Sequence, residues 1–323
     1  MKYLCFIFKV ILILAVFNSV TNADSLYGPL KIRNLNPMIS IFGLPTWPNF
    51  NSGHSSLQYL TERANHFQFA NRGNELVRLD GETHRNILII NNKIENNDVV
   101  SIEIPQISHT SGSLDDFING WHKTFGMPDG NRDMFPEDSM SLLYIINNNQ
   151  VFNLTNTVKG LGDIQVNYRK VFSNTSSIFS IGVKIPSGDH TRLLGSGSPD
   201  LSITYFKDLS NKNLTSSYKF YWGFGVLATG KSRMFDNKND YIGLGIFGLN
   251  YKIHNSLILK AQMDFHTPFY KSVLDEFKAS IQANIGLLLR LEENKDITFS
   301  VGEDLIVKTA PDVTLSIDFE WSY

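Results

Sequence analysis

The C-terminal stretch DVTLSIDFEWSY, residues 312–323, alternates strictly between apolar and polar side chains. Successive side chains of a β-strand point to opposite faces, so the alternation predicts a strand with one apolar and one polar face. Phe319, Trp321 and Tyr323 put three aromatic rings on the apolar face at the end of the sequence. A soluble β-sandwich would rarely end in this way, and the stretch therefore favours a strand whose apolar face meets lipid.

The same stretch resembles the closing strand of bacterial outer-membrane barrels, in which a terminal aromatic residue is the assembly signal. The resemblance implies that Phe319, Trp321 and Tyr323 form this signal and that the barrel-assembly machinery is a partner. It also implies a location in the outer membrane of a Gram-negative bacterium, with outer-membrane lipid around the barrel.

The N-terminus has the pattern of a secretory signal peptide. Lys2 and Lys9 supply positive charge, residues 10–17 form an apolar core, and a small-residue cleavage site ends at Ala23. The pattern predicts that residues 1–23 are removed from the mature protein. The alternative is an N-terminal membrane helix, but polar residues end the apolar run sooner than a spanning helix requires.

Composition narrows the chemistry that we expect. Cys5 is the only cysteine and lies in the predicted signal peptide, so the mature chain would hold no disulfide and no cysteine-ligated metal. The formal net charge of -2 gives no reason to expect nucleic-acid binding. No helical pair of histidines has metal-ligand spacing, and we expect neither a metal site nor a cofactor.

From residue 54 onward the sequence is a series of amphipathic strands with short connections rich in Asn, Gly, Ser and Lys. It predicts an all-β fold, a transmembrane antiparallel β-barrel over residues 54–323 with about twelve strands, or fourteen as the alternative. A sandwich needs fewer strands, and a propeller would show a repeated blade unit. The aromatic pair Phe269 and Tyr270 follows a strand and is expected to join a girdle at a membrane interface.

The region before the strands is rich in Pro, Gly and Asn. Prolines at 29, 37, 45 and 48 argue against a central strand within residues 24–53. We expect an N-terminal arm that lies against or inside the barrel mouth, with a flexible leader as the alternative.

One internal segment changes from strand to helical spacing. Residues 113–126 have a potential N-cap at Ser113 and a potential C-cap at Gly126. The apolar stripe of this predicted α-helical insert consists of Leu114, Phe117, Trp121 and Phe125. Such a stripe needs a partner surface, and we expect the insert to plug the pore or cap the barrel.

Polar side chains on the strands are expected to face the lumen. The candidates are Arg78, Asp80, Glu82, His84, Asp264, His266, Glu303 and Asp304. Carboxylates beside histidines can bind metal, relay protons or perform acid–base chemistry. The favoured alternative is a polar ladder that fills a narrow lumen, because alternate spacing is what any strand imposes.

Glu303 does not fit the alternation of its own strand. It shares its parity with Val301 and Leu305, which would point a carboxylate at lipid. Either Gly302 marks a β-bulge that turns Glu303 inward, or the strand leaves the membrane at this point. Asp304 would face the lumen in a strand without a bulge.

Several segments resemble the DUF3187 family of uncharacterised proteobacterial outer-membrane proteins. They are RNLNP (33–37), FGLP (42–45), LDGETHR (79–85), SGSLDDFINGWHKTFGMPDG (111–130), GLGD (160–163), KIPSGD (184–189), AQMDFHTPFY (261–270) and EDLIVKTAPDV (303–313). The run of GLGD, IPSGD and GSGSPD is also similar to barrels linked to phenol-degradation pathways. The resemblance covers essentially the whole mature chain and implies fold and location, but no reaction.

The function that we expect from these patterns is a channel or transporter for small solutes, hydrophobic ones among them. A structural, lumen-filled barrel and an enzyme that modifies lipid or lipopolysaccharide are the alternatives. No nucleophile and base can be paired from the sequence, so no catalytic residue is assigned. The partners implied are outer-membrane lipid, the assembly machinery and an unidentified small solute.

Overall fold

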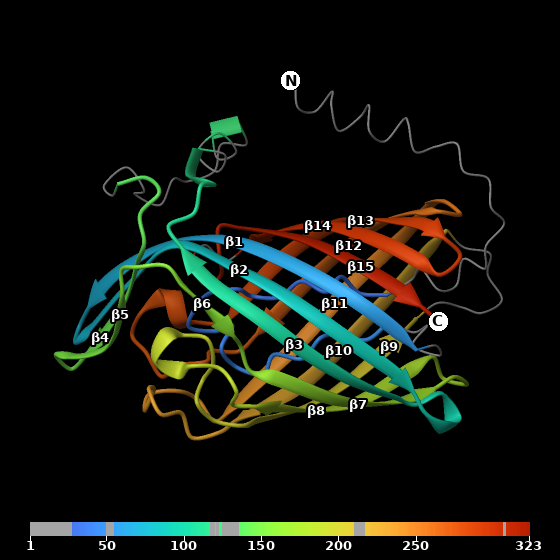
Figure 1. The fold of residues 1–323 in the computed structure, drawn as a ribbon, viewed down its shortest axis with the longest axis horizontal. Helices are drawn as coiled ribbons and strands as arrows, with labels where there is room; N and C mark the ends of the chain where they lie inside the picture. Colours follow the sequence, from blue (N-terminus) through green and yellow to red (C-terminus); the bar gives the residue numbers. More distant parts are fainter. Residues whose placement is uncertain are drawn as a thin grey trace.

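The computed structural model describes residues 28–49, 55–116, 120, 123–124, 136–209, 217–305 and 308–323. The predicted signal peptide lies outside these residues. Within them, fifteen strands form one antiparallel sheet, and twelve of these strands close it into a barrel (Figure 1). The predicted all-β barrel of twelve strands is thereby confirmed.

The ring and its additions are formed by long, tilted strands. The ring consists of β1 (Ser56–Arg72), β2 (Glu75–Lys93), β3 (Val99–Thr110), β7 (Ile164–Phe172), β8 (Ser177–Ile185), β9 (Asp200–Asp208), β10 (Tyr218–Thr229), β11 (Tyr241–His254), β12 (Leu257–His266), β13 (Ser280–Glu292), β14 (Lys295–Asp304) and β15 (Val313–Ser322). Three shorter strands, β4 (Ser141–Ile146), β5 (Asn149–Leu154) and β6 (Val158–Leu161), extend the sheet beyond the ring at one end.

The C-terminal strand closes the barrel. β15 pairs with β14 on one side and with β1 on the other, where the register runs from Ser56 opposite Ser322 to Asn65 opposite Val313. A closed ring leaves no unpaired strand edge, which is the condition for a sheet to cross a bilayer.

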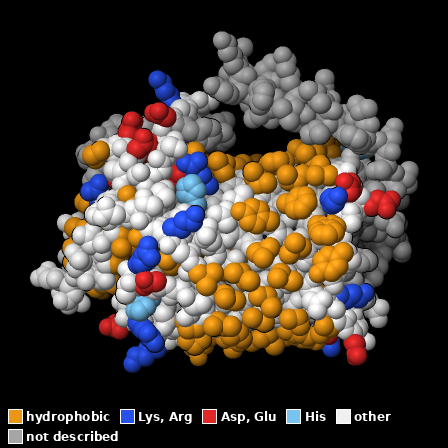
Figure 2. Space-filling view, viewed as in Figure 1, with side chains coloured by type: hydrophobic (Ala, Val, Ile, Leu, Met, Phe, Trp, Pro, Cys, Tyr) orange, Lys and Arg blue, Asp and Glu red, His pale blue; other side chains and the backbone are white. Residues whose placement is uncertain are grey.

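The outer surface of the ring carries a continuous apolar band (Figure 2). On β12, for example, Leu259, Met263 and Phe265 are 40–47% exposed, whereas Lys260 and Gln262 between them are buried. The amphipathic pattern predicts that each strand points its apolar side chains outward, to lipid. This is the case in β8, β9, β10, β12 and β15. The band is the lipid-facing surface. Among the described residues, no helix is long and apolar enough to cross a membrane.

The two ends of the barrel differ in the length of their connections. At the end that holds Ser56 and Tyr323, the described connections are short, such as residues 255–256 and 293–294. At the opposite end lie the longer connections 186–199, 230–240 and 267–279. Outer-membrane barrels have short periplasmic turns and long extracellular loops, so the end that holds Ser56 and Tyr323 is the periplasmic side.

The predicted α-helix at 113–126 falls largely outside the described residues. Its described members Asp115, Asp116, Gly120, Lys123 and Thr124 have helical backbone, but no continuous helix is described there. The helices whose bounds are described are three single 3-10 turns: η2 (Glu95–Asn97), η4 (His190–Arg192) and η5 (Asp275–Phe277).

We predict that a charge on the lipid face destabilises the barrel according to its depth. Ile285 is 58% exposed near the middle of β13, so Ile285→Arg should lower the free energy of unfolding in lipid by about 2–4 kcal/mol. Leu291 lies on the same face of β13, beside the periplasmic turn, and Leu291→Arg should cost about 0–1 kcal/mol. Denaturant unfolding in liposomes measures both variants, and equal losses would contradict the assignment of the band.

Candidate functional site: a lumen filled by the N-terminal segment

The space inside the ring is occupied by residues 28–49, which we call the lumen segment (Figure 1). A ring of about eight strands is already filled by its own side chains, so a twelve-stranded ring has room for a further chain. The lumen segment is almost entirely buried. The sequence left open whether this arm lies inside the barrel or is a flexible leader, and the described part lies inside.

The lumen segment enters and leaves at the same end of the barrel. The Gly28 carbonyl accepts from Lys260 Nζ at 2.9 Å, and Asn49 Nδ2 donates to Glu320 at 3.3 Å, both toward the periplasmic side. Midway, the Met38 carbonyl accepts from the Tyr270 hydroxyl at 2.6 Å, in an extracellular loop. The segment therefore rises through the lumen, turns near the extracellular mouth and descends again.

The ascending limb is bound to the wall by side chains of β12. Leu30 N donates to Gln262 Oε1 at 2.8 Å, and Gln262 Nε2 donates back to the Leu30 carbonyl at 3.2 Å. Asn34 Nδ2 lies 3.0 Å from His266 Nε2. The inward polar parity of this strand thus supplies partners for the backbone and side chains of the limb.

Buried ion pairs join the ascending limb to the periplasmic half of the wall, and a hydrogen bond joins the descending limb to it. Lys31 Nζ lies 3.3 Å from Asp318 on β15, and Arg33 Nη2 lies 3.5 Å from Glu103 on β3. Thr46 on the descending limb also donates to Glu103, at 2.9 Å. Breaking one partner of a buried pair costs about 3–5 kcal/mol, so these contacts hold the segment firmly.

A second ionic cluster holds the turn of the lumen segment at the extracellular mouth. Lys184 Nζ lies 2.5 Å from Asp163 Oδ2 and 3.2 Å from Asp200 Oδ2, and it donates to the Ile41 carbonyl at 3.3 Å. Asp200 Oδ2 accepts from the Gly43 amide at 2.8 Å. We call Asp163, Lys184 and Asp200 the latch, because Lys184 and Asp200 bind the turn directly and Asp163 holds Lys184.

The latch also binds the extracellular loops. Asp163 accepts from the backbone amides of Gly188 at 2.8 Å and Ser196 at 3.1 Å, and Asp200 accepts from the amide of Gly230 at 2.9 Å. Its residues come from the GLGD, KIPSGD and GSGSPD motifs. Their placement explains these motifs as one structural unit that joins loops to the lumen segment.

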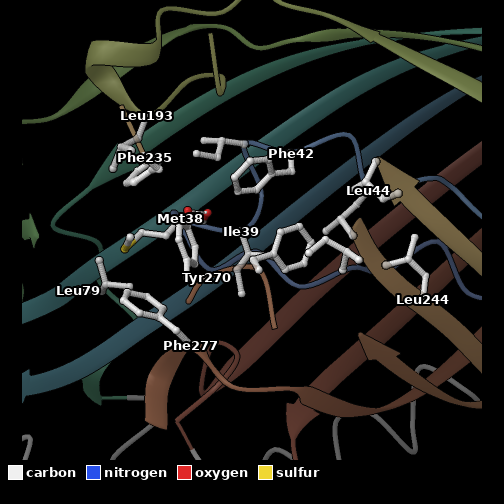
Figure 3. Packing of buried hydrophobic residues seen from close by; sticks show 14 of the residues in the cluster. Met38, Ile39, Phe42, Leu44, Leu79, Leu193, Phe235, Leu244, Tyr270 and Phe277 are labelled. Atoms are coloured by element: carbon white, nitrogen blue, oxygen red, sulfur yellow. Dashed lines mark hydrogen bonds between the residues drawn. The ribbon is translucent and has the colours of Figure 1, made fainter. Parts of the chain in front are cut away.

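Above the ionic contacts the lumen is apolar. Met38, Ile39 and Phe42 of the lumen segment pack against Tyr270 and Phe235 from extracellular loops (Figure 3). The ring of Phe42 stacks on Phe269 at a centroid distance of 5.1 Å. The lumen is thus polar toward the periplasm and apolar toward the extracellular side.

Glycines in the wall make room for the lumen segment. A Cβ at Gly286 would lie 2.6 Å from Leu30 Cδ2, and one at Gly223 would lie 2.7 Å from the ring of Trp47. Both distances are shorter than a van der Waals contact. Wall and segment are therefore complementary in shape.

Little open space remains beside the lumen segment. Two cavities lined by described residues border it and have volumes of about 10 Å³ and about 40 Å³, far below the size of a small-molecule site. A larger cavity of about 700 Å³ lies among the extracellular loops and is lined by β5, η4 and residues 233–237.

Two of the predicted lumenal residues do lie in the lumen. Asp264 accepts from Gln262 Nε2 at 2.8 Å and Asn284 Nδ2 at 2.6 Å. His266 Nδ1 lies 3.0 Å from the Thr267 carbonyl, so Nδ1 carries the proton and Nε2 accepts from Asn34. Both side chains bind neutral groups of the wall or of the lumen segment.

The four lumenal candidates on β2 lie on the outer face of the barrel, so the prediction that they face the lumen is wrong. On β2 the inward parity carries Val77, Leu79, Thr83 and Arg85, all buried at 0–3% exposure. The residues that face outward are Arg78, Asp80, Glu82 and His84. Beside the turn of the lumen segment the interior of the barrel is apolar, so β2 points apolar side chains inward there. The outer face of this part of β2 lies beyond the apolar band and carries polar side chains. A polar side chain on this part of the strand therefore does not indicate the lumen.

Glu82 is the centre of this outer cluster. Its carboxylate accepts from Arg63 at 2.6 Å, His84 at 3.1 Å and the amides of Ser113 and Leu114 at 2.6 and 2.7 Å. Burial alone would raise its pKa, but these hydrogen bonds lower the pKa to about 2. The stabilisation is complete above the ordinary carboxyl range and is lost only as the pH falls toward 2.

The start of the predicted helical insert is bound to this outer face. Leu114 N donates to Glu82, and Asp115 accepts from Asn65 Nδ2 at 2.9 Å on the outer parity of β1. The predicted stripe residues Phe117, Trp121 and Phe125 lie outside the described residues. Within the described chain, the lumen is occupied by residues 28–49.

Glu303 lies on β14, which ends its pairing with β15 one residue earlier. β14 pairs with β15 up to Gly302 opposite Thr314, and its register with β13 is regular through Asp304, so no bulge occurs at Gly302. The bulge is therefore excluded, and β14 keeps its pairing with β13 past Glu303 to Asp304, which lies opposite Gln282. Asp304 accepts from the amides of Thr309 at 2.7 Å and Ala310 at 2.8 Å and thereby organises the loop.

Phe269 and Tyr270 belong to the core and not to an interfacial girdle. They are 1% and 3% exposed and pack on Phe42. Trp321 and Tyr323 are exposed at the periplasmic end, with ring centroids 5.9 Å apart. The described residues contain no group of three or more His, Cys, Asp or Glu that could hold a metal ion.

The closed ring, its apolar band and its filled lumen define an outer-membrane β-barrel protein. The chain belongs to the family described as "Protein of unknown function (DUF3187)", which matches residues 4–323. No curated protein matches the sequence.

Solved outer-membrane proteins are similar to this chain at low sequence identity, and the first of those that follow shares its fold. The COG4313 outer membrane channel from Pseudomonas putida F1 is 10% identical, with a TM-score of 0.53 over 88% of this chain and 98% of that chain. The KdgM porin in complex with disordered oligogalacturonate is 12% identical, with a TM-score of 0.42 over 83% and 99%. The Pseudomonas putida toluene transporter TodX is 10% identical, with a TM-score of 0.39 over 84% and 90%.

We predict that enlarging a wall glycine displaces the lumen segment. Gly286→Val should push Leu30 out of place and expose residues 28–34 to solvent, which hydrogen exchange of their amides measures as a faster rate. Ala283→Val, on the outward parity of the same strand, should leave that rate unchanged. An equal response of the two variants would show that Gly286 makes no room for the segment.

A second prediction concerns Glu82. Glu82→Ala removes four acceptor contacts, so exchange of the Ser113 and Leu114 amides should accelerate by roughly tenfold or more. Asn86→Ala changes the same outer parity of β2, where Asn86 contacts only Tyr59 among the hydrogen bonds described, and should have no such effect. Retained protection in Glu82→Ala would contradict the anchoring role.

Proposed function

We propose that this protein is an outer-membrane channel for small solutes and that the lumen segment is its gate. The observation that carries the proposal is how the segment closes the lumen. Among the described residues, its backbone–backbone hydrogen bonds are internal, such as Ile39 N to the Asn36 carbonyl at 2.8 Å, and its links to the wall use side chains. The ring is held by strand pairing and does not need the segment for its backbone bonds.

The latch supports an opening step at the extracellular mouth. Lys184 is bound at once to the turn of the segment and to two wall carboxylates. A change that weakens this cluster loosens the turn and the loops together. Asp200 binds Gly43 of the turn and Gly230 of a loop, and Lys184 connects the turn to Asp163, which binds the loop at residue 188. Population of an open state then depends on how strongly the latch favours the closed one.

The apolar upper lumen supports small hydrophobic solutes as the cargo. Phe152 lines the 700 Å³ extracellular cavity and lies 6.2 Å from Phe235, measured between ring centroids. Phe235 lies 5.3 Å from Tyr270, which lies 6.1 Å from Phe42 of the lumen segment. A solute that leaves the cavity toward the gate meets aromatic rings, and these favour apolar and aromatic molecules.

A structural, lumen-filled barrel is the second candidate. The observation that favours it is the density of buried contacts, with cavities of only about 10 and 40 Å³ beside the segment. In that case the lumen segment rigidifies the wall and never leaves. The two candidates differ in whether weakening the latch produces current.

We predict that Lys184→Met raises the open probability of single channels in planar bilayers by about tenfold or more. The substitution leaves Asp163 and Asp200 buried without their cation, and such a loss costs about 3–5 kcal/mol in the closed state. Small aromatic solutes on the extracellular side should reduce the current more than sugars of equal size. Lys207→Met, at an exposed backbone contact near the periplasmic end, is the matched control and should behave as wild type.

Deletion of residues 28–49 completes the experiment. If the deleted barrel inserts and conducts steadily while the intact protein is mostly silent, the segment is the gate. Silence of Lys184→Met and of the deletion variant, with insertion verified, would reject the channel and favour the structural barrel.

A further inference from the structure

One row of polar side chains crosses the outer surface of the barrel beside the extracellular edge of the apolar band. The register places Arg63 of β1 opposite His84 of β2, His84 opposite Ser108 of β3, and Ser108 opposite Lys159 of β6. Neighbouring strands are about 5 Å apart, so the row is about 15 Å long. All four residues lie on the outward parity of their strands.

Along each strand, the side chains change in the same order toward the membrane. On β1, Arg63 is followed on the outward parity by Thr61 and then Tyr59. On β2, the order is His84, Asn86 and Leu88, and on β3 it is Ser108, Gln106 and Ile104. A charged or hydroxyl row thus stands one row of uncharged polar side chains away from the apolar band, where lipid headgroups lie.

The outer surface agrees with this order. Lys, Arg and His side chains gather along the extracellular edge of the hydrophobic band (Figure 2). Arg78 is neutralised by Asp80 at 3.1 Å and does not add to the charge of the row. The row itself carries the cations Arg63 and Lys159, and Glu82 is the carboxylate that Arg63 contacts.

Glu82 positions two members of the row and does not compete with an anion outside. Its side chain is fully buried, and its oxygens accept from Arg63, His84 and two backbone amides. The guanidinium and the imidazole are therefore held in fixed places, and about a third of each side chain remains accessible. Preorganised polar groups bind an anion at lower entropic cost.

Lys159 completes the row from β6. Its side chain is exposed, and among the residues that the structure describes none pairs with its ammonium. β6 is a four-residue strand outside the ring that pairs with the extracellular end of β3. Its pairing brings this ammonium to the same surface as Arg63 and His84.

From this row we propose that Arg63, His84 and Lys159 bind the phosphate of a phosphorylated glycolipid in the outer leaflet of the membrane. The lipid's acyl chains lie on the apolar rows below, and its sugar hydroxyls meet Asn86 and Gln106. The site is independent of the channel function, because all of its residues face away from the lumen.

Native mass spectrometry of the refolded protein in detergent, titrated with lipid A, tests the proposal. Lys159→Gln should weaken binding several-fold, and Arg63→Gln combined with Lys159→Gln should weaken it by roughly tenfold or more, because hydrogen bonds to charged groups are the strong ones. Lipid A without its phosphates should bind wild type as weakly as the intact lipid binds the double variant. Lys170→Gln, an exposed outward lysine near the periplasmic end of β7, is the matched control and should bind like wild type.

Heat-dependent gel mobility verifies that each variant is folded. Lys159→Gln should fold like wild type, because the side chain is exposed and no described residue pairs with its ammonium. Equal affinity of wild type and the double variant would overturn the proposal. So would equal binding of lipid A with and without phosphate, or an equal loss in Lys170→Gln.

Discussion

The lumen of a twelve-stranded ring is too wide for wall side chains alone, and the rest of this structure follows from how it is filled. Residues 28–49 supply the missing volume, but they bring backbone polar groups into a closed interior. Those groups must find partners, because an unpaired buried donor or acceptor is costly. The inward side chains of the wall provide them, from Gln262 beside Leu30 to Asp200 beside Gly43.

This requirement explains the two halves of the lumen. Toward the periplasm, both limbs of the segment lie against the wall. Polar side chains of the wall bind them there, as in the ion pair between Lys31 and Asp318. Toward the outside, the turn of the segment closes on itself, and Phe42 packs with loop aromatics. The latch at Lys184 lies where the two environments meet, so it is the position at which a small change can affect both.

The sequence predicts the barrel well because the lipid imposes a simple rule on every strand. β12 and β15 alternate as expected, since one face meets hydrocarbon and the other meets polar partners. The rule fails on β2 beyond the membrane. There the inner face packs Val77 and Leu79 against the apolar turn of the lumen segment, and Glu82 faces outward to bind the loop after β3. Parity alone cannot reveal this, because it does not say what fills the lumen.

Which segment fills the lumen could not be decided from the sequence either. Residues 113–126 have the stronger local signal, a helical stripe, whereas residues 28–49 have no periodicity. The contacts of the lumen segment with the wall are all distant in sequence, such as Leu30 with Gln262 or Ile41 with Lys184. The motifs around Asp163, Lys184 and Asp200 were visible, but their meeting at one cluster depends on the register of β7, β8 and β9.

Photo-crosslinking in intact outer membranes tests most directly whether the lumen segment fills the barrel. A photoreactive phenylalanine at position 47 replaces Trp47, whose ring lies against Gly223. The account predicts that ultraviolet light joins residue 47 to peptides of β9 and β10 within the same chain, as identified by mass spectrometry. Crosslinks to lipid, to other proteins or to no defined wall peptide would contradict it.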